Sequence, residues 1–230
     1  MTKRFGFTLA EVLITLGIIG VVAAMSIPAL IANTNSSKFR SQFKKSLSSL
    51  NQAALMAQAQ YDFDYSSASA CGTTTNGNPK AGSSTMCALL NGTLAGAKVT
   101  TFDKLRNNNG GTYAITAADS TANYTTANSD IVYTMADGSI FIFKNTAANC
   151  TLDPGAAVSG ANCKGIIDVN GPALPNKEVK CDAGGSNGSA TAPCVVKKQT
   201  GMTDVFPVAI HDSVVEPLSD AARYILSAAK

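Results

Sequence analysis

Apolar residues dominate the first part of the chain. From Gly6 to Ile31 the sequence has about the length of a membrane-spanning helix, and Glu11, near its start, is its single charged side chain. An ionised carboxylate costs roughly 2.5–3.5 kcal/mol at the centre of such a helix. We therefore expect Glu11 to have a partner and a function.

A second hydrophobic pattern follows the first. Apolar residues recur at three- and four-residue steps, which is typical of an amphipathic helix with one buried stripe. The stripe consists of Phe39, Phe43, Leu47, Leu50, Ala54 and Ala57. Because no Gly or Pro interrupts residues 29–61, we predict one helix from Phe7 to about Gln60, ~80 Å long. Pro28 removes a backbone donor and should bend or locally unwind this helix.

The remaining chain predicts an antiparallel sheet. Ile131–Ala136 and Ser139–Lys144 flank Asp137-Gly138, a pair that favours a two-residue hairpin loop with a type I′ turn. Further strands are predicted at Gly165–Val169 and Asp204–Ile210. A sheet whose apolar face packs on the helical stripe would bury both surfaces.

These patterns predict an α+β, ladle-shaped fold, with a long N-terminal helix packed on an antiparallel sheet with disulfide-linked loops. The expected divisions are residues 1–6, a short basic segment; 7–31, an apolar helix of membrane-spanning length; 32–61, its amphipathic continuation; and 62–230, a globular β domain. Turn-rich insertions are expected at 65–105 and 182–193. A short final helix is expected at Leu218–Ala229, capped by Ser219.

Charge is sparse. The formal net charge is +3, and it is +1 without Lys3 and Arg4 of the N-terminal basic segment. This balance gives no indication of nucleic-acid binding as a main activity.

Six cysteines follow the apolar segment, and an even number favours disulfides in an oxidising compartment. Six cysteines allow fifteen pairings. Three short sequential loops are favoured because each encloses turn-forming residues and would link segments that hold themselves poorly. These pairs are Cys71–Cys87, Cys150–Cys163 and Cys181–Cys194. Zinc ligation is disfavoured, because there is no Cys-x-x-Cys and the chain has one histidine.

Oxygen ligands for calcium are present near a glycine turn. Asp168 and Asn170 precede Gly171, and Asp204 follows later. Such ligands suit a hard cation, but the simpler interpretation, which we favour, is that Asp168 and Asn170 cap turns. No other cofactor is expected.

Enzymatic activity is not expected either. His211 stands beside Asp212, but adjacent residues on a strand point to opposite faces. No serine or cysteine is marked as their nucleophile.

The N-terminus carries the parts of a specific export signal. A short basic leader, Met1 to Gly6, is followed by Phe7-Thr8-Leu9-Ala10-Glu11 and then by the apolar helix. This segment resembles the class III signal of type IV pilins and type II secretion pseudopilins. The resemblance implies that a membrane-embedded prepilin peptidase cuts between Gly6 and Phe7 and methylates the new amine of Phe7.

The resemblance also implies that residues 1–6 are a leader and that residues 7–31 form a transmembrane or filament-core helix, and it assigns roles to two residues inside this helix. Glu11 corresponds to the buried glutamate of the family, and Pro28 falls where many members carry a proline. After cleavage, the Phe7 amine would lie one helical turn before Glu11, so a neighbouring subunit could supply the cation that the acid lacks. The implied protein is a non-enzymatic filament subunit that is anchored in the bacterial inner membrane, with its C-terminal domain in the periplasm, before it enters a cell-surface or periplasmic filament.

Partners implied by the resemblance are other copies of the chain, the prepilin peptidase, an inner-membrane assembly platform and membrane lipid. A type IV pilus subunit, serving adhesion, motility or DNA uptake, is slightly favoured over a pseudopilin by the long loop-rich region after Tyr61. A non-polymerising anchored binding module is the alternative of another class. At the N-terminus, the alternatives are an ordinary signal peptide cleaved at Ala24-Met25-Ser26 and a plain membrane anchor.

Overall fold

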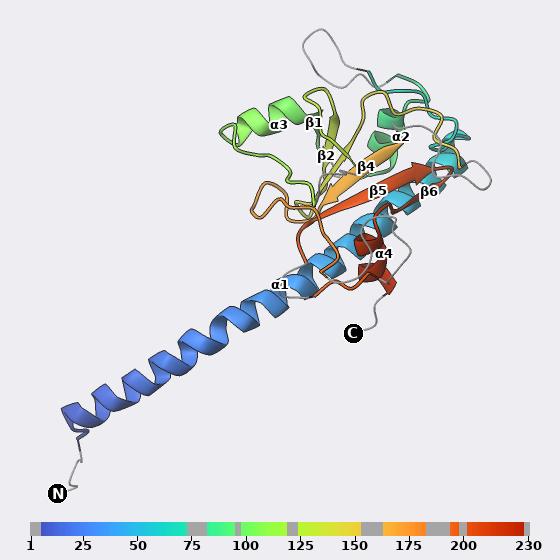
Figure 1. Ribbon diagram of the computed structural model, residues 1–230. Helices are drawn as coiled ribbons and strands as arrows, with labels where there is room; N and C mark the ends of the chain where they lie inside the picture. The colour runs from blue at the N-terminus through green and yellow to red at the C-terminus, as the bar shows by residue number, and fades with distance from the viewer. Residues whose placement is uncertain are drawn as a thin grey trace, which may run out of the picture.

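One helix forms the handle of the molecule. The computed structural model describes residues 6–72, 82–94, 98–118, 124–152, 163–182, 194–197 and 202–227. Helix α1, Leu9–Tyr61, has 53 residues, and its first half projects away from the globular part (Figure 1). The helix continues on both sides of Pro28, so the proline does not interrupt it. The expected bend there stays a prediction.

The globular part is built around one antiparallel sheet of six strands, each paired with its neighbours in sequence. The strands are β1 Lys98–Thr101, β2 Ile131–Thr134, β3 Ile140–Phe143, β4 Lys164–Asp168, β5 Val205–His211 and β6 Val214–Pro217. The predicted α+β class and the antiparallel sheet are confirmed.

The β2–β3 hairpin exists, but its predicted turn is wrong. Thr134 pairs with Ile140, and the Met135 amide donates to the Ser139 carbonyl at 2.8 Å, which leaves a three-residue loop. A type I′ turn requires a positive φ at both central residues. Gly138 has a φ of 86°, but the φ of Asp137 is not positive, so a type I′ turn is excluded. The Asp137 carboxylate accepts from the amide of Ser139 at 3.1 Å and pairs with Lys45 at 2.9 Å, contacts that fix the longer loop.

Both faces of the sheet are covered. The predicted stripe of α1 is buried on one face, where Phe43 stacks on Phe206 with ring centroids 4.1 Å apart. Phe141 and Phe143 belong to this core, whereas Ile140 and Ile142 belong to the core on the other face. The alternation of side chains along β3 therefore divides the strand between two cores.

Several short elements were not predicted. Helices α2, Met86–Thr93, and α3, Phe102–Asn108, and strand β1 lie within or next to the segment expected to be a turn-rich insertion, and strand β6 follows β5. The predicted final helix is present as α4, Asp220–Ser227, where Ser219 accepts from the Ala222 amide at 3.2 Å. A second insertion was expected at 182–193. Residues 183–193 lie outside the part of the chain that the structure describes.

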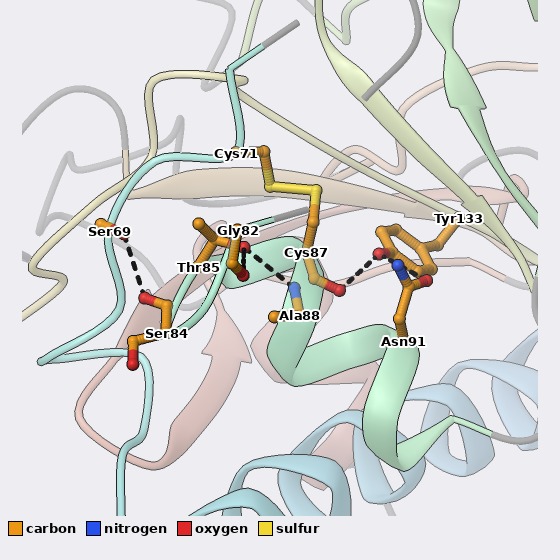
Figure 2. Close-up of a disulfide and its surroundings, with 9 residues drawn as sticks. All are labelled: Ser69, Cys71, Gly82, Ser84, Thr85, Cys87, Ala88, Asn91 and Tyr133. Carbon is orange, nitrogen blue, oxygen red and sulfur yellow. Dashed lines mark hydrogen bonds between the residues drawn. A yellow bond between two sulfur atoms is a disulfide. The ribbon is translucent and has the colours of Figure 1, made fainter. Parts of the chain in front are cut away.

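Helix α2 is held by covalent and polar contacts (Figure 2). Thr85 caps it by accepting from the Ala88 amide at 3.1 Å, and the Cys71–Cys87 disulfide ties its first turn to the preceding loop. The Tyr133 hydroxyl lies 2.9 Å from the carbonyl of Cys87. These contacts join α2 to strand β2 from positions far apart in sequence.

All six cysteines are in disulfides. The bonds join Cys71 to Cys87, Cys150 to Cys163 and Cys181 to Cys194, the three sequential pairs favoured by the sequence analysis. The two cysteines of each bond are 13 to 16 residues apart in the sequence. The disulfides therefore close three short loops, and none of the six cysteines lies within a strand of the sheet.

Candidate functional site

The start of α1 is fixed by a reciprocal capping box between Thr8 and Glu11. The Glu11 amide donates to the Thr8 hydroxyl at 3.3 Å, and the Glu11 carboxylate accepts from the Thr8 amide and hydroxyl at 2.8 Å each. Thr8 itself has extended backbone angles. This arrangement satisfies two amides that a helix start otherwise leaves without partners.

The capping box determines where the helix begins relative to the predicted cleavage point. Gly6, Phe7 and Thr8 are outside the helix, and Phe7 is 87% exposed. A peptide bond in non-helical, exposed backbone can enter the cleft of a peptidase, whereas a bond inside a helix first has to be unwound. The Gly6–Phe7 bond is therefore accessible, and Glu11 is held one turn away from it.

The sequence contained the signal for this capping box. Thr8-Leu9-Ala10-Glu11 matches the pattern of a capping Ser or Thr followed three residues later by Glu, just before an apolar run. The sequence led us to expect Glu11 only as a partner for an amine. The structure adds that its carboxylate already has an internal partner in Thr8.

Beyond the capping box, α1 presents apolar side chains on every side. The large side chains from Leu9 to Ile31 are exposed, and this part of α1 is long and apolar enough to cross a membrane. The globular part does not cover this surface in Figure 1. Such a surface has to be covered by lipid or by other protein.

The three residues considered for calcium lie at one end of strands β4 and β5. The Asp168 carboxylate accepts from the Tyr113 hydroxyl at 2.7 Å and from the Asn170 amide at 3.0 Å. That of Asp204 accepts from the amides of Asn176 and Lys177 at 3.0 and 2.9 Å. The two acids thus hold neighbouring turns through protein donors.

The electrostatics of these carboxylates reflect their burial. Burial raises the pKa of Asp168 to about 7, and the nearby Asp204 carboxylate adds to the increase. Burial also raises the pKa of Asp204. Within the part of the chain that the structure describes, no cluster of three or more His, Cys, Asp or Glu side chains could hold a metal ion. The contacts of Asp168 are those of a turn cap.

His211 and Asp212 contact one another, contrary to the expectation that they point apart. Their closest side-chain atoms, Nδ1 and Oδ2, are 3.0 Å apart. The reason is that β5 ends at His211, and Asp212 adopts a left-handed φ of 48° that turns its side chain back. Ser213, the nearest hydroxyl in sequence, donates to Asp64 at 2.8 Å instead. The pair closes the β5–β6 turn.

Comparison with known proteins identifies the N-terminal signal. Residues 1–27 match the family model described as the prokaryotic N-terminal methylation motif. Neither the curated proteins nor the solved structures contain a match to the chain. The matched segment includes Gly6, Phe7 and Glu11, the residues that the sequence analysis assigned to processing and assembly. The motif marks a structural class of proteins, and with the apolar half of α1 it supports a membrane-anchored, pilin-like or pseudopilin precursor.

Proposed function

We propose that this chain is the precursor of a structural subunit of a type IV pilus-like filament. The prepilin peptidase cuts between Gly6 and Phe7 and methylates the Phe7 amine, and the mature chain polymerises through the first half of α1. The observation that carries the proposal is the combination of the methylation motif at residues 1–27 with an apolar helix surface that the globular part leaves uncovered.

The chemistry of assembly follows from the start of α1. Cleavage creates a positive amine on Phe7, next to Thr8, whose own amide donates to Glu11. In the apolar interior of a filament, an uncompensated carboxylate or amine is strongly unfavourable. The Glu11 carboxylate has acceptor capacity beyond its two bonds to Thr8. The methylated amine of a neighbouring subunit therefore pairs with Glu11 and sets the register between subunits.

The apolar half of α1 and the disulfides also indicate where the precursor is located. Before assembly, α1 anchors the precursor in the bacterial inner membrane, and the disulfide-containing globular part occupies the oxidising periplasm. An assembly platform in that membrane then transfers subunits into the filament, which reaches the cell surface. The helix surface that lipid covers in the precursor is the surface that other copies of α1 cover in the filament.

Processing is tested by Gly6→Val. A Cβ atom at Gly6 meets no other atom within 4 Å, and the same holds at Gly17, inside the helix. Gly6→Val should therefore leave the fold intact but block cleavage, because the peptidase has to accommodate the new side chain next to the scissile bond. Gly17→Val is the matched control and should be processed. Mass spectrometry of the membrane protein should find N-methylated Phe7 as the first residue in the wild type and the control.

Two results would contradict the proposal. A mature terminus near Ile27 would establish an ordinary signal peptide, and complete processing of Gly6→Val would exclude cleavage by a peptidase that reads this glycine. Filament preparation then separates the remaining functions. Filaments sheared from the cell surface support a pilus, periplasmic filaments support a secretion pseudopilus, and processed protein that never forms multimers supports an anchored binding module.

A further inference from the structure

The charges on α1 are all of one sign after Glu11. Between Val12 and Tyr61 the helix contains no acidic residue, whereas basic side chains occur within two turns of one another, at Lys38, Arg40, Lys44 and Lys45. Lys45 pairs with Asp137 at 2.9 Å. In the part of the chain that the structure describes, the other three make no ion pair. Lys38, Arg40 and Lys44 therefore have no anionic partner among the residues that the structure describes.

The continuity of α1 fixes the depth of these side chains. If residues 12–31 span the hydrocarbon layer, Lys38 and Arg40 lie seven and nine residues past Ile31, or about 10 and 14 Å along the axis. The headgroup layer extends about 5–8 Å beyond the hydrocarbon. Helical side chains tilt toward the N-terminus, here toward the membrane, and long basic stems reach several ångströms more. Both charged groups therefore reach the headgroups, whereas Lys44, about 20 Å along, does not.

We propose that Lys38 and Arg40 bind the phosphates of anionic phospholipids in the outer leaflet of the membrane that holds the precursor. The guanidinium of Arg40 suits bidentate contact with phosphate, and the Lys38 ammonium adds a point charge. The two residues lie on opposite flanks of the buried stripe of α1, so one lipid contacts each side of the helix. This contact fixes the depth and rotation of α1 before assembly.

The proposal rests on the membrane-anchored precursor of the proposed function, but it does not depend on polymerisation. Segment 32–37, Ala-Asn-Thr-Asn-Ser-Ser, carries no charge. No acidic residue between the apolar segment and Lys38 can therefore compete with lipid phosphate for Lys38 or Arg40. Charge complementarity and direct continuity with the apolar surface both point to a lipid headgroup as the occupant.

The test uses the uncut full-length precursor in nanodiscs made of equal parts phosphatidylcholine and phosphatidylglycerol. After mild detergent extraction, native mass spectrometry measures the ratio of phosphatidylglycerol to phosphatidylcholine retained by the protein. Lys38→Gln with Arg40→Gln should lower this preference by about fivefold for each basic residue removed. High salt should weaken the wild-type preference, because exposed charges are screened.

Two further variants make the test specific. Lys38→Arg with Arg40→Lys keeps both charges and should retain the wild-type preference. Lys180→Gln with Lys197→Gln removes two exposed charges from the globular part and should also leave the ratio unchanged. The inference is overturned if the Lys38 and Arg40 double variant keeps the wild-type ratio while inserted, or if the Lys180 and Lys197 pair lowers it equally.

Other outcomes also decide the question. Normal lipid retention with defective filaments in the Lys38 and Arg40 variant would assign these residues to an acidic surface of a neighbouring subunit and overturn the lipid site. Absence of the wild-type precursor from the membrane fraction would instead overturn the proposed function, and the lipid site with it. The two failures are therefore distinguishable.

Discussion

The two halves of α1 are one continuous helix with opposite relations to the rest of the molecule. In the second half, one apolar stripe is buried against the globular part, as at Leu50, which is 0% exposed. In the first half, apolar residues face every direction, and Leu30 is 68% exposed. The second half thus obtains its partner by folding. The first half requires a partner that the chain does not supply, and its one acid lies at its very start.

The largest expected effect tests that external partner. Glu11→Ala should abolish most filament formation while processed monomer accumulates in the membrane, because the Phe7 amine of the neighbouring subunit loses its counter-charge in an apolar environment. Glu11→Gln is the matched variant, because glutamine preserves the capping box with Thr8 but carries no charge. Both variants should fail to assemble if charge pairing governs register.

Crosslinking gives the measurement. Every native cysteine is in a disulfide, so thiols introduced at Leu9 and Leu13 report on contacts between neighbouring α1 helices alone. We expect crosslinked multimers with Glu11 and few without it. Equal crosslinking in all three proteins would refute charge pairing, and restoration by Gln alone would assign the role of Glu11 to helix capping.

A second prediction compares the same residue type in the two halves. Leu50→Ala should lower the free energy of unfolding of the globular part by about 2–5 kcal/mol, because it leaves a cavity between α1 and the sheet. Leu30→Ala should leave that free energy unchanged. Denaturant unfolding in micelles, followed by the tyrosine signal because the chain has no Trp, measures both. Equal destabilisation would mean that the first half also packs on the globular part.

The sequence predicted well where periodicity is a local property. The buried stripe of α1, the strands around Ile140 and Ile166, and the Ser219-capped final helix all follow from residues close in the chain. Helix α2 was missed because its position depends on distant partners, among them Tyr133. The hairpin turn was mispredicted for the same reason, since Lys45 on α1 contributes to fixing Asp137.

In the candidate site, too, features set by neighbouring residues could be predicted and features set by backbone conformation could not. Gly6, Phe7 and Glu11 were predicted from a short sequence motif, and the family model matches the segment that contains them, residues 1–27. The role of Thr8 is also encoded locally, by the Thr-x-x-Glu spacing, although the charge of Glu11 pointed to a charged partner instead. The contact between His211 and Asp212 could not be read from strand alternation, because it depends on the left-handed backbone with which the strand ends.

A third prediction concerns the disulfides, all of which lie in the globular part. Replacing both Cys71 and Cys87 by Ser should lower the free energy of unfolding by about 3 kcal/mol, the chain-entropy estimate for a loop of this size. Tyr133→Phe, which keeps the disulfide but loses the hydroxyl contact with α2, should cost only about 1 kcal/mol. Thermal unfolding of the full chain in micelles measures both. A larger loss for Tyr133→Phe would mean that the hydroxyl, rather than the disulfide, holds α2.

The last and smallest of the main effects is a pH dependence of the globular part, since residues 12–31 of α1 contain no titratable side chain. Burial raises the pKa of Asp168 to about 7, above the value of about 3.9 expected in the unfolded chain. The folded state therefore binds more protons between these values, and the free energy of unfolding should fall as pH rises from about 4 to 7. Asp168→Asn should reduce this slope and, at pH 8, stabilise the protein by on the order of 1–2 kcal/mol. Asp204, whose pKa is also raised by burial, should keep part of the slope.

Asp103→Asn, on the partly exposed surface of α3, is the matched control for this titration and should leave the slope between pH 4 and 7 unchanged. Denaturant unfolding at several pH values in EDTA gives the measurement, and repeating it with calcium separates a turn cap from a cation site. A turn cap leaves the curve unchanged, because Asp168 and Asp204 already accept hydrogen bonds from Tyr113 and backbone amides. If calcium stabilises the wild type but not Asp168→Asn, the two carboxylates bind a cation instead. If Asp168→Asn keeps the wild-type slope, another group titrates between pH 4 and 7.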